Sequence, residues 1–161
     1  MTSTTNTQSP VRLPNGASSL PGVLTAGQPS AAHLSQLAQS GIKTLIDLRS
    51  PNEPRGFDEA ATVRAAGLTY RNIPVTPATL GNHEFDEFRK LHRDESARPV
   101  LVHCGSANRV GALLIPYLVL DEKRSRDDAL KIAGEVGLRS DHLARAALSY
   151  VGEKDDGRFT R

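Results

Sequence analysis

The chain has 161 residues, of which 38% are hydrophobic and 24% are charged, and its formal net charge is +2. These are ordinary values for one soluble globular domain that is long enough to bury a core. Acidic and basic residues are interspersed and tryptophan is absent, so the sequence shows neither the basic block nor the aromatic platform of a nucleic-acid-binding protein. No apolar run approaches the roughly 18 residues of a membrane span.

The two ends of the chain are rich in polar residues. We expect residues 1–15 to form a disordered N-terminal tail and residues 153–161 a polar C-terminal tail, with one domain over residues 16–152 between them. The N-terminus has neither a basic start nor an apolar stretch, and the one cysteine, Cys104, cannot form an internal disulfide. We therefore expect a cytoplasmic protein, or a periplasmic one if a leader has been removed.

Short apolar segments alternate with segments of helical periodicity. In chain order, the expected elements are a strand at 23–25, a helix that follows the N-cap Ser30 and stops at Gly41, a strand at 42–48, a helix at 57–66, a strand at 68–75, a helix from about 82, a strand at 99–103, and helices at 110–120, 125–135 and 140–151. This alternation predicts an α/β fold with a mainly parallel central sheet flanked by helices. Ligands in such folds bind beyond the carboxyl ends of the strands.

The expected strand at 99–103 leads into a loop that begins with a cysteine and ends with an arginine, HCGSANR at residues 103–109. Backbone N–H groups of such a loop can converge on one point, and the following helix directs its positive end there. The same donors stabilise a thiolate at Cys104, which lowers its pKa below the free value of about 8.5. Arg109 supplies a planar fork for two oxygens of a tetrahedral anion.

We predict that Cys104 and Arg109 form a catalytic pair. The predicted phosphate-binding residues are Gly105, Ser106, Ala107, Asn108 and Arg109, and the predicted supporting residues are His103 and Arg49. The alternative for a lone cysteine is burial as a small hydrophobe, but a strand end followed by a polar glycine-containing loop favours an active site. His103 is better explained as a buried residue that fixes the loop by hydrogen bonds. Arg49 either adds positive potential for an anionic substrate or pairs with the carboxylate at position 47 or 53.

The segment LVHCGSANRVGALL resembles the signature of the cysteine-dependent tyrosine and dual-specificity phosphatases, and VLTAGQPSAAHLSQLAQSGIKTLIDLR and GLTYRNIPV resemble the upstream part of that superfamily. The closest resemblance is to the bacterial beta-lactamase-hydrolase-like phosphatase domains, over roughly residues 20–125. It implies a phosphotyrosine-phosphatase-like fold, Cys104 as nucleophile, Arg109 as transition-state clamp and residues 105–109 as phosphate cradle. In the superfamily the thiolate attacks phosphorus, and water then releases phosphate from a phosphocysteine.

Two departures from the phosphatase pattern lie in the loop itself. Four residues separate Cys104 from Arg109 where phosphatases have five, and four is the spacing of the rhodanese-type sulfurtransferases. Val110 stands where phosphatases have a serine or threonine that assists the second step, and Ser106 is a candidate substitute.

A third departure concerns the general acid. The stretch 76–79 lacks the aspartate that the resemblance leads one to expect there, and such an acid contributes about 10²–10⁴ in rate. Glu84 and Asp86 lie a little downstream, but they are better explained as solvent-facing charges at the start of a helix.

These observations favour a cysteine-dependent phosphatase that hydrolyses phosphate monoesters of a small molecule or a phosphoprotein. One alternative is a rhodanese-like sulfurtransferase that forms a persulfide on Cys104. Another is a weakly active module that binds anions or phosphoproteins. The five histidines are scattered and no glycine pattern matches a nucleotide fingerprint, so we predict no metal and no cofactor.

Overall fold

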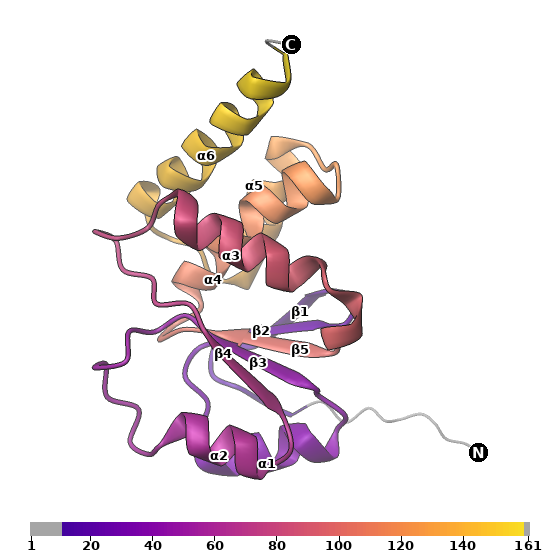
Figure 1. Cartoon of the computed structure of the whole chain (residues 1–161), viewed down its shortest axis with the longest axis vertical. Coiled ribbons are helices and arrows are strands. Elements are labelled where there is room, and N and C mark those ends of the chain that lie inside the picture. The colour runs from indigo at the N-terminus through magenta and orange to yellow at the C-terminus, as the bar shows by residue number, and fades with distance from the viewer. Residues whose placement is uncertain (1–10, 160–161) are drawn as a thin grey trace, which may run out of the picture.

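The computed structural model describes residues 11–159 of the chain, with side chains through residue 155. Its centre is a five-stranded sheet in the order β1-β2-β5-β3-β4 (Figure 1). The strands are β1 (Ala17–Leu20), β2 (Val23–Ala26), β3 (Thr44–Asp47), β4 (Thr69–Asn72) and β5 (Val100–His103). Only the pair β1 and β2 is antiparallel within this sheet, while β2, β5, β3 and β4 run parallel to one another. The mainly parallel sheet predicted from the sequence is therefore confirmed.

Helices cover both faces of the sheet, as Figure 1 shows. On one face lie α1 (Ala31–Gln39) and α2 (Glu59–Ala65). Their buried side chains, among them Leu34, Leu37 and Val63, belong to a small hydrophobic cluster. The other face carries α3 (Asn82–Arg93), α4 (Asn108–Pro116), α5 (Arg126–Val136) and α6 (Asp141–Phe159). The larger hydrophobic cluster fills this second layer. Every residue from 110 to 116 is buried, which shows that α4 lies at the centre of the cluster.

Local signals in the sequence explain most element boundaries. The side chain of Ser30 caps α1 by accepting the N–H of His33 at 3.2 Å, as the sequence predicted. Gly41 and Gly67 follow α1 and α2 with positive φ angles of 99° and 91°, which favour glycine. Between α3 and β5 lies a short 3₁₀ turn (Glu95–Ala97), and a π-helical turn (Tyr117–Asp121) continues α4.

The structure corrects the predicted tails and adds one strand. The N-terminal tail predicted for 1–15 lies outside the described residues through residue 10, but Val11 and Leu13 already pack against the core. The C-terminal tail predicted from 153 is helical to Phe159, because α6 continues and Asp155 pairs with Arg126 at 3.1 Å. β1 was not predicted because its sequence ASSL is polar and short, and it is held by pairing with β2.

No helix among residues 11–159 is long and apolar enough to cross a membrane.

Close packing of α4 against α5 generates a test of the fold. A Cβ added at Gly111 would lie 2.8 Å from both the Ala133 carbonyl oxygen and the Leu138 Cβ atom. We expect Gly111→Ala to lower the free energy of unfolding by about 1–3 kcal/mol, because neighbouring backbone has to move. Gly134→Ala is the matched control: an added methyl group there meets nothing within 4 Å, so the substitution should raise stability by about 0.5–1 kcal/mol. Urea unfolding measures both changes, and equal effects would contradict the packing described.

Candidate active site

Cys104 directly follows β5 at the carboxyl edge of the sheet. Its backbone N–H donates to the carbonyl of Ala26 at the end of β2, 3.3 Å away, and none of its surface is exposed. The loop 105–107 then turns the chain into α4, which begins at Asn108. The strand–loop–helix arrangement predicted for residues 103–109 is thus present, with the positive end of α4 directed at the loop.

Two neighbouring segments hold the loop in shape. On one side the N–H of Gln28 donates to the carbonyl of Gly105 at 3.2 Å, and a Cβ at Gly27 would lie only 2.6 Å from that same oxygen. On the other side Gly137 packs against Ala107, which has the unusual left-handed φ of 67°. Because both neighbours are glycines, the backbone approaches the loop more closely than a side chain would allow.

The polar side chains of the loop face the connection between α5 and α6. Asn108 Oδ1 accepts the N–H groups of Arg139 and Ser140 at 2.8 and 3.3 Å. Ser106 Oγ accepts a hydrogen bond from Arg139 Nη2 at 3.2 Å. Ser106 and Asn108 therefore anchor the loop through their side-chain oxygens. Arg139, which the sequence did not single out, adds an exposed positive charge beside the loop.

Arg109 is held by a carboxylate from a distant part of the chain. Its Nη1 and Nη2 donate to the two oxygens of Glu53 at 2.9 and 3.1 Å, and Nη1 also donates to the carbonyl of Val75 at 2.9 Å. Burial by itself lowers the pKa of Arg109, but the hydrogen bond to Glu53 and the adjacent Cys104 sulfur raise it above its ordinary value. The sulfur of Cys104 is thus close enough to Arg109 to affect its pKa, and the catalytic role of the two residues stays a prediction.

Glu53 remains ionised in this arrangement. The hydrogen bond from Arg109 holds the pKa of Glu53 well below its ordinary value against the opposing effect of burial, and the N–H of Ser50 and the side chain of Arg49 lower it further. Glu53 is therefore a permanent anion that orients Arg109, and it is unsuited to donate a proton to a leaving group.

The side chain of Arg49 forms an ion pair with Glu53. Of the two interpretations of Arg49, a source of positive potential or the partner of a nearby carboxylate, the structure favours the second. The Nε of Arg49 donates to Glu53 Oε1 at 2.9 Å and its Nη1 to Gln28 Oε1 at 2.8 Å. Its contact with Asp47 is made by the backbone N–H alone, at 2.9 Å. Arg49 thus supports Arg109 indirectly, by fixing the carboxylate that binds it.

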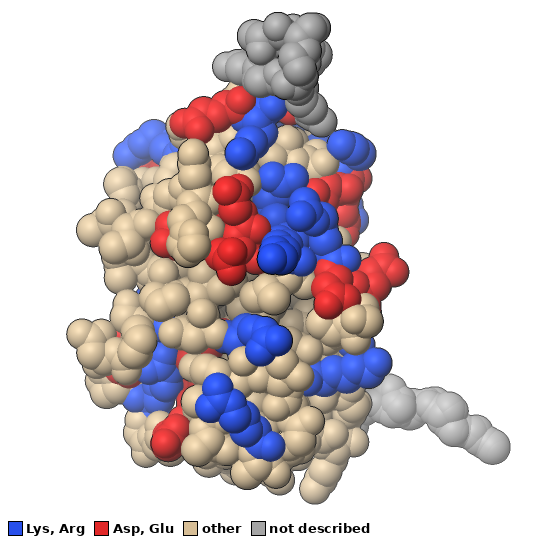
Figure 2. Space-filling model, in the orientation of Figure 1, with Lys and Arg blue, Asp and Glu red and all other residues tan. Residues whose placement is uncertain are grey.

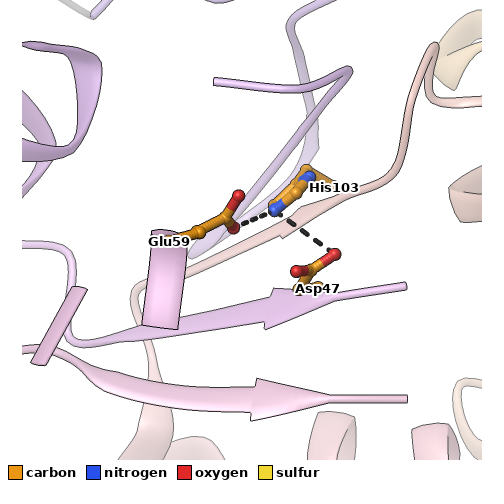
Figure 3. Close-up of side chains that lie close together, drawn as sticks. All are labelled: Asp47, Glu59 and His103. Carbon is orange, nitrogen blue, oxygen red and sulfur yellow. Dashed lines mark hydrogen bonds and ion pairs between the residues drawn. The ribbon is translucent and has the colours of Figure 1, made fainter. Parts of the chain in front are cut away.

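His103 lies in a buried charged cluster behind the loop (Figure 3). Its Nε2 contacts the Glu59 carboxylate in a short hydrogen bond and lies 3.7 Å from Asp47 Oδ1. Its Nδ1 lies 3.2 Å from the carbonyl oxygen of Cys104. Both partners are oxygen acceptors, so each ring nitrogen of His103 faces an oxygen atom. The predicted role of His103 in fixing the loop fits these contacts.

The cluster has a metal-like arrangement that sequence spacing did not reveal. Asp47, Glu59 and His103 offer ligand atoms within 4.8 Å of one another. Arg55 already forms an ion pair with Asp47 at 2.8 Å and lies 3.7 Å from Glu59. Both carboxylates thus already have a positively charged partner in Arg55, and Glu59 also contacts His103. We interpret the cluster as structural.

Glu84 and Asp86, considered as alternative acids, are both engaged in α3. Glu84 Oε1 accepts the N–H of Gly81 at 3.0 Å and so caps the helix. Asp86 accepts a short hydrogen bond from the hydroxyl of Tyr150 on α6. Both contacts favour structural roles.

Comparison with known proteins identifies the family. The profile of a family described as DSP-PTPase phosphatase fused to NAD+ kinase matches residues 16–148. The chain belongs to this family. Its membership makes the chain a phosphatase-like hydrolase, as the sequence predicted.

Individual relatives agree with this assignment. A beta-lactamase hydrolase-like protein of Xylella fastidiosa is 31% identical over 107 residues, which amount to 64% of this chain and 25% of that protein. The chain thus spans about a quarter of the length of this curated relative. The structure of Tk-PTP in its active form has a TM-score of 0.73 at 16% identity, over 87% of this chain and 97% of that one. A variant of P. aeruginosa TpbA in complex with pTyr has a TM-score of 0.65 at 22% identity, over 90% and 91%. These likenesses confirm the predicted phosphatase fold.

The residues that the sequence analysis missed share one property: each lies on a segment distant from the side chain that it contacts near the site, or pairs with a residue that does. They are Gln28, Glu53 as the partner of Arg109, Arg55, Glu59 and Arg139. Only Glu53 carried a signal, since it stands four residues after Arg49.

The lowered pKa of Glu53 predicts a pH-dependent contribution to stability. A carboxylate whose pKa is lowered by folding stabilises the protein fully at pH values above its pKa in the unfolded chain, which is about 4.3 for Glu. This stabilisation is lost progressively as the pH falls from there toward the lower pKa of the folded protein. We expect Glu53→Gln to lower the free energy of unfolding by about 1 kcal/mol at pH 7, a figure reduced for solvent screening of a partly exposed pair. The difference in free energy of unfolding between this variant and the parent protein should become smaller between pH 5 and pH 3. Urea unfolding at pH 7, 5 and 3 measures it, with exposed Glu135→Gln as control, and a gap independent of pH would contradict the assignment.

Proposed function

We propose that the chain is a cysteine-dependent phosphatase that hydrolyses phosphate monoesters through a phosphocysteine on Cys104. The observation that carries the proposal is the placement of Cys104 and Arg109 at the two ends of a short loop in front of α4, with the guanidinium of Arg109 oriented by Glu53. The family assignment supports it, and so does the complex of the TpbA variant with pTyr, a phosphate monoester. We take the substrate to be a phosphorylated small molecule or phosphoprotein.

The proposed reaction has two balanced steps. The Cys104 thiolate attacks phosphorus, an S–P bond forms, and the bond from phosphorus to the leaving oxygen breaks with its electron pair. The leaving oxygen takes its proton from water, because no acid stands in the stretch 76–79. A water oxygen then attacks phosphorus, the S–P bond breaks, the thiolate is regenerated and the proton passes to solvent.

Arg109 is suited to bind the phosphate with the edge that Glu53 leaves free. An arginine has five N–H donors, and three of those of Arg109 are used by Glu53 and Val75. The Nε–H and one Nη2–H remain, and they point in parallel as a fork for two phosphate oxygens. Glu53 fixes the plane of this fork, so little entropy is lost when the anion binds. The backbone of residues 105–109 supplies the remaining donors of the proposed cradle.

Access to the sulfur is part of the proposal. Cys104 has no exposed surface, whereas 18% of the Arg109 side chain is exposed. Arg109 borders both the sulfur and the surface, and the position of a Cβ at Gly105 lies 3.4 Å from its Nη2. We infer that the phosphate reaches Cys104 alongside this side chain, with movement of the loop that covers the sulfur.

A rhodanese-like sulfurtransferase is the second candidate, and one observation favours it. Four residues, not five, lie between Cys104 and Arg109, which gives a smaller ring than the phosphatase loop. In that reaction the Cys104 thiolate takes the outer sulfur of thiosulfate, sulfite leaves, and cyanide then removes the sulfur as thiocyanate.

One pair of assays distinguishes the candidates. We expect the protein to release phosphate from p-nitrophenyl phosphate, Cys104→Ser to abolish the release, and Arg109→Lys to lower kcat/KM by about 10²–10³, because the bidentate fork is lost. Exposed Arg145→Lys is the matched control and should retain the parent rate. If the protein forms thiocyanate from thiosulfate and cyanide but releases no phosphate, the phosphatase proposal is wrong and the sulfurtransferase is the better explanation. If neither product forms while phosphate raises the melting temperature, a binding module is the better explanation.

The pH profile tests the absence of a protein acid. A phosphatase with a general acid loses activity at high pH when that acid ionises, which produces a descending limb. We expect kcat/KM for p-nitrophenyl phosphate to rise with pH and then to stay level up to pH 9. A descending limb below that pH would reveal a proton donor and refute this part of the mechanism.

A further inference from the structure

A cavity of about 290 Å³ lies at the opposite edge of the sheet from Cys104. Its walls come from the first residues of β3, β4 and β5, from the end of α3 and from the 3₁₀ turn that follows. The residues that matter for its chemistry are Lys43, Arg71, His92, Asp94 and Arg98. The whole of β5, roughly 10 Å at 3.3 Å per residue, separates this cavity from the candidate active site.

His92 in the wall of the cavity is buried without a hydrogen-bond partner. Only 2% of its surface is exposed, and neither ring nitrogen has a partner among the described residues. Its ring is stacked on Phe88 at 4.9 Å and meets the edge of Tyr117 at 4.5 Å, which fixes its orientation. Burial, helped by the charge of Arg98, lowers the pKa of His92 to about 3, so the ring is neutral at pH 7 with one N–H to donate. A buried polar group without a partner is destabilising.

Arg98 beside it is only partly satisfied. Its Nη2 donates to the carbonyl of His92 at 2.8 Å and to the hydroxyl of Tyr117 at 2.9 Å, so the side chain is held in place. Its Nε is buried and has no partner within the described part of the chain. The ring nitrogens of His92 and the Nε of Arg98 each expose less than 1 Å², so they lie within the wall of the cavity, and Arg98 brings a full positive charge to that wall.

The surface around the cavity is positive. Lys43 and Arg71 are exposed at its rim, and Asp94 is the one carboxylate among the residues that line it. Asp94 Oδ1 is already used by the N–H and the hydroxyl of Ser96, at 3.0 and 2.6 Å. Figure 2 shows basic side chains on this face of the molecule, over α3 and over the strands beneath it. The charge excess attracts anions and repels cations.

We propose that this cavity is a second binding site, for a small organic anion whose phosphate or carboxylate group pairs with the guanidinium of Arg98, beside the unpartnered ring of His92. The cavity is at the small end of the range for ligand pockets, which favours a compact metabolite-sized molecule over a peptide. Apolar surface from Ile46, Leu91 and Val100 accommodates the rest of the molecule. Lys43 and Arg71 attract it to the rim. The proposal does not depend on the chemistry at Cys104.

Titrations followed by NMR test the site with two anions and a neutral analogue. Phenylphosphonate and benzoate distinguish a phosphate-type from a carboxylate-type ligand, and benzyl alcohol controls for apolar binding. The signals to follow are the ring nitrogens of His92 and the Nε of Arg98 in the ¹⁵N-labelled protein. We expect at least one anion to shift these signals in a saturable way, and benzyl alcohol to leave them unchanged.

Charge reversal at the rim supplies the matched comparison. Lys43→Glu/Arg71→Glu should weaken binding of that anion by roughly tenfold or more, because two attractive charges become repulsive. Lys131→Glu/Arg145→Glu, exposed on α5 and α6, changes the net charge equally and should retain the affinity within about threefold, since distant surface charges are screened. In the titrations, the proposal fails if neither anion shifts the two signals, if benzyl alcohol shifts them equally, or if only residues 105–109 respond. In the comparison of variants, it fails if both double variants lose affinity alike.

Discussion

The buried carboxylate of Asp47 is the interaction on which the arrangement at the carboxyl edge of the sheet depends. Its Oδ2 accepts hydrogen bonds from Arg55 Nε at 3.0 Å and the Tyr70 hydroxyl at 2.6 Å, and its Oδ1 accepts the N–H of Arg49 at 2.9 Å. Burial and the hydrogen bond to Asp47 raise the pKa of Tyr70, so the phenol keeps the proton that it donates. A buried carboxylate without such partners costs several kcal/mol, and the loop after β3 therefore has to fold back over the sheet edge to supply them.

This requirement also explains how the candidate active site obtains its orienting carboxylate. Glu53 lies between Arg49 and Arg55, the two loop residues that Asp47 binds, and its position is fixed once they are fixed. From there it meets Arg109 with both oxygens. The geometry of Arg109 thus depends on a buried charge that never touches it. Removal of Asp47 would disturb this arrangement as well as the core.

The sequence predicted those features that are encoded over a few consecutive residues. The strand end at His103, the loop that follows and the helix N-terminus were readable because one segment holds all three. Pairings between distant segments were not readable: nothing near Arg109 indicates that its partner is Glu53, 56 residues away. The strand at Ala17–Leu20 was missed for a related reason, because its polar sequence becomes a strand only by pairing with β2. Local patterns determine elements, whereas the fold determines which side chains meet.

The two ends of β5 differ in how their buried polar groups are satisfied. At the carboxyl end each ring nitrogen of His103 lies beside an oxygen acceptor, and Arg55 pairs with the nearby carboxylate of Asp47. At the amino end His92 has none among the described residues, although an apolar ring of the same size would fit between Phe88 and Tyr117 without that cost. A buried polar group without a partner calls for an explanation, and the cavity beside this histidine, lined by more basic than acidic side chains, offers one: the proposed anion would place a polar ligand at the end of the strand where the protein itself supplies no partner.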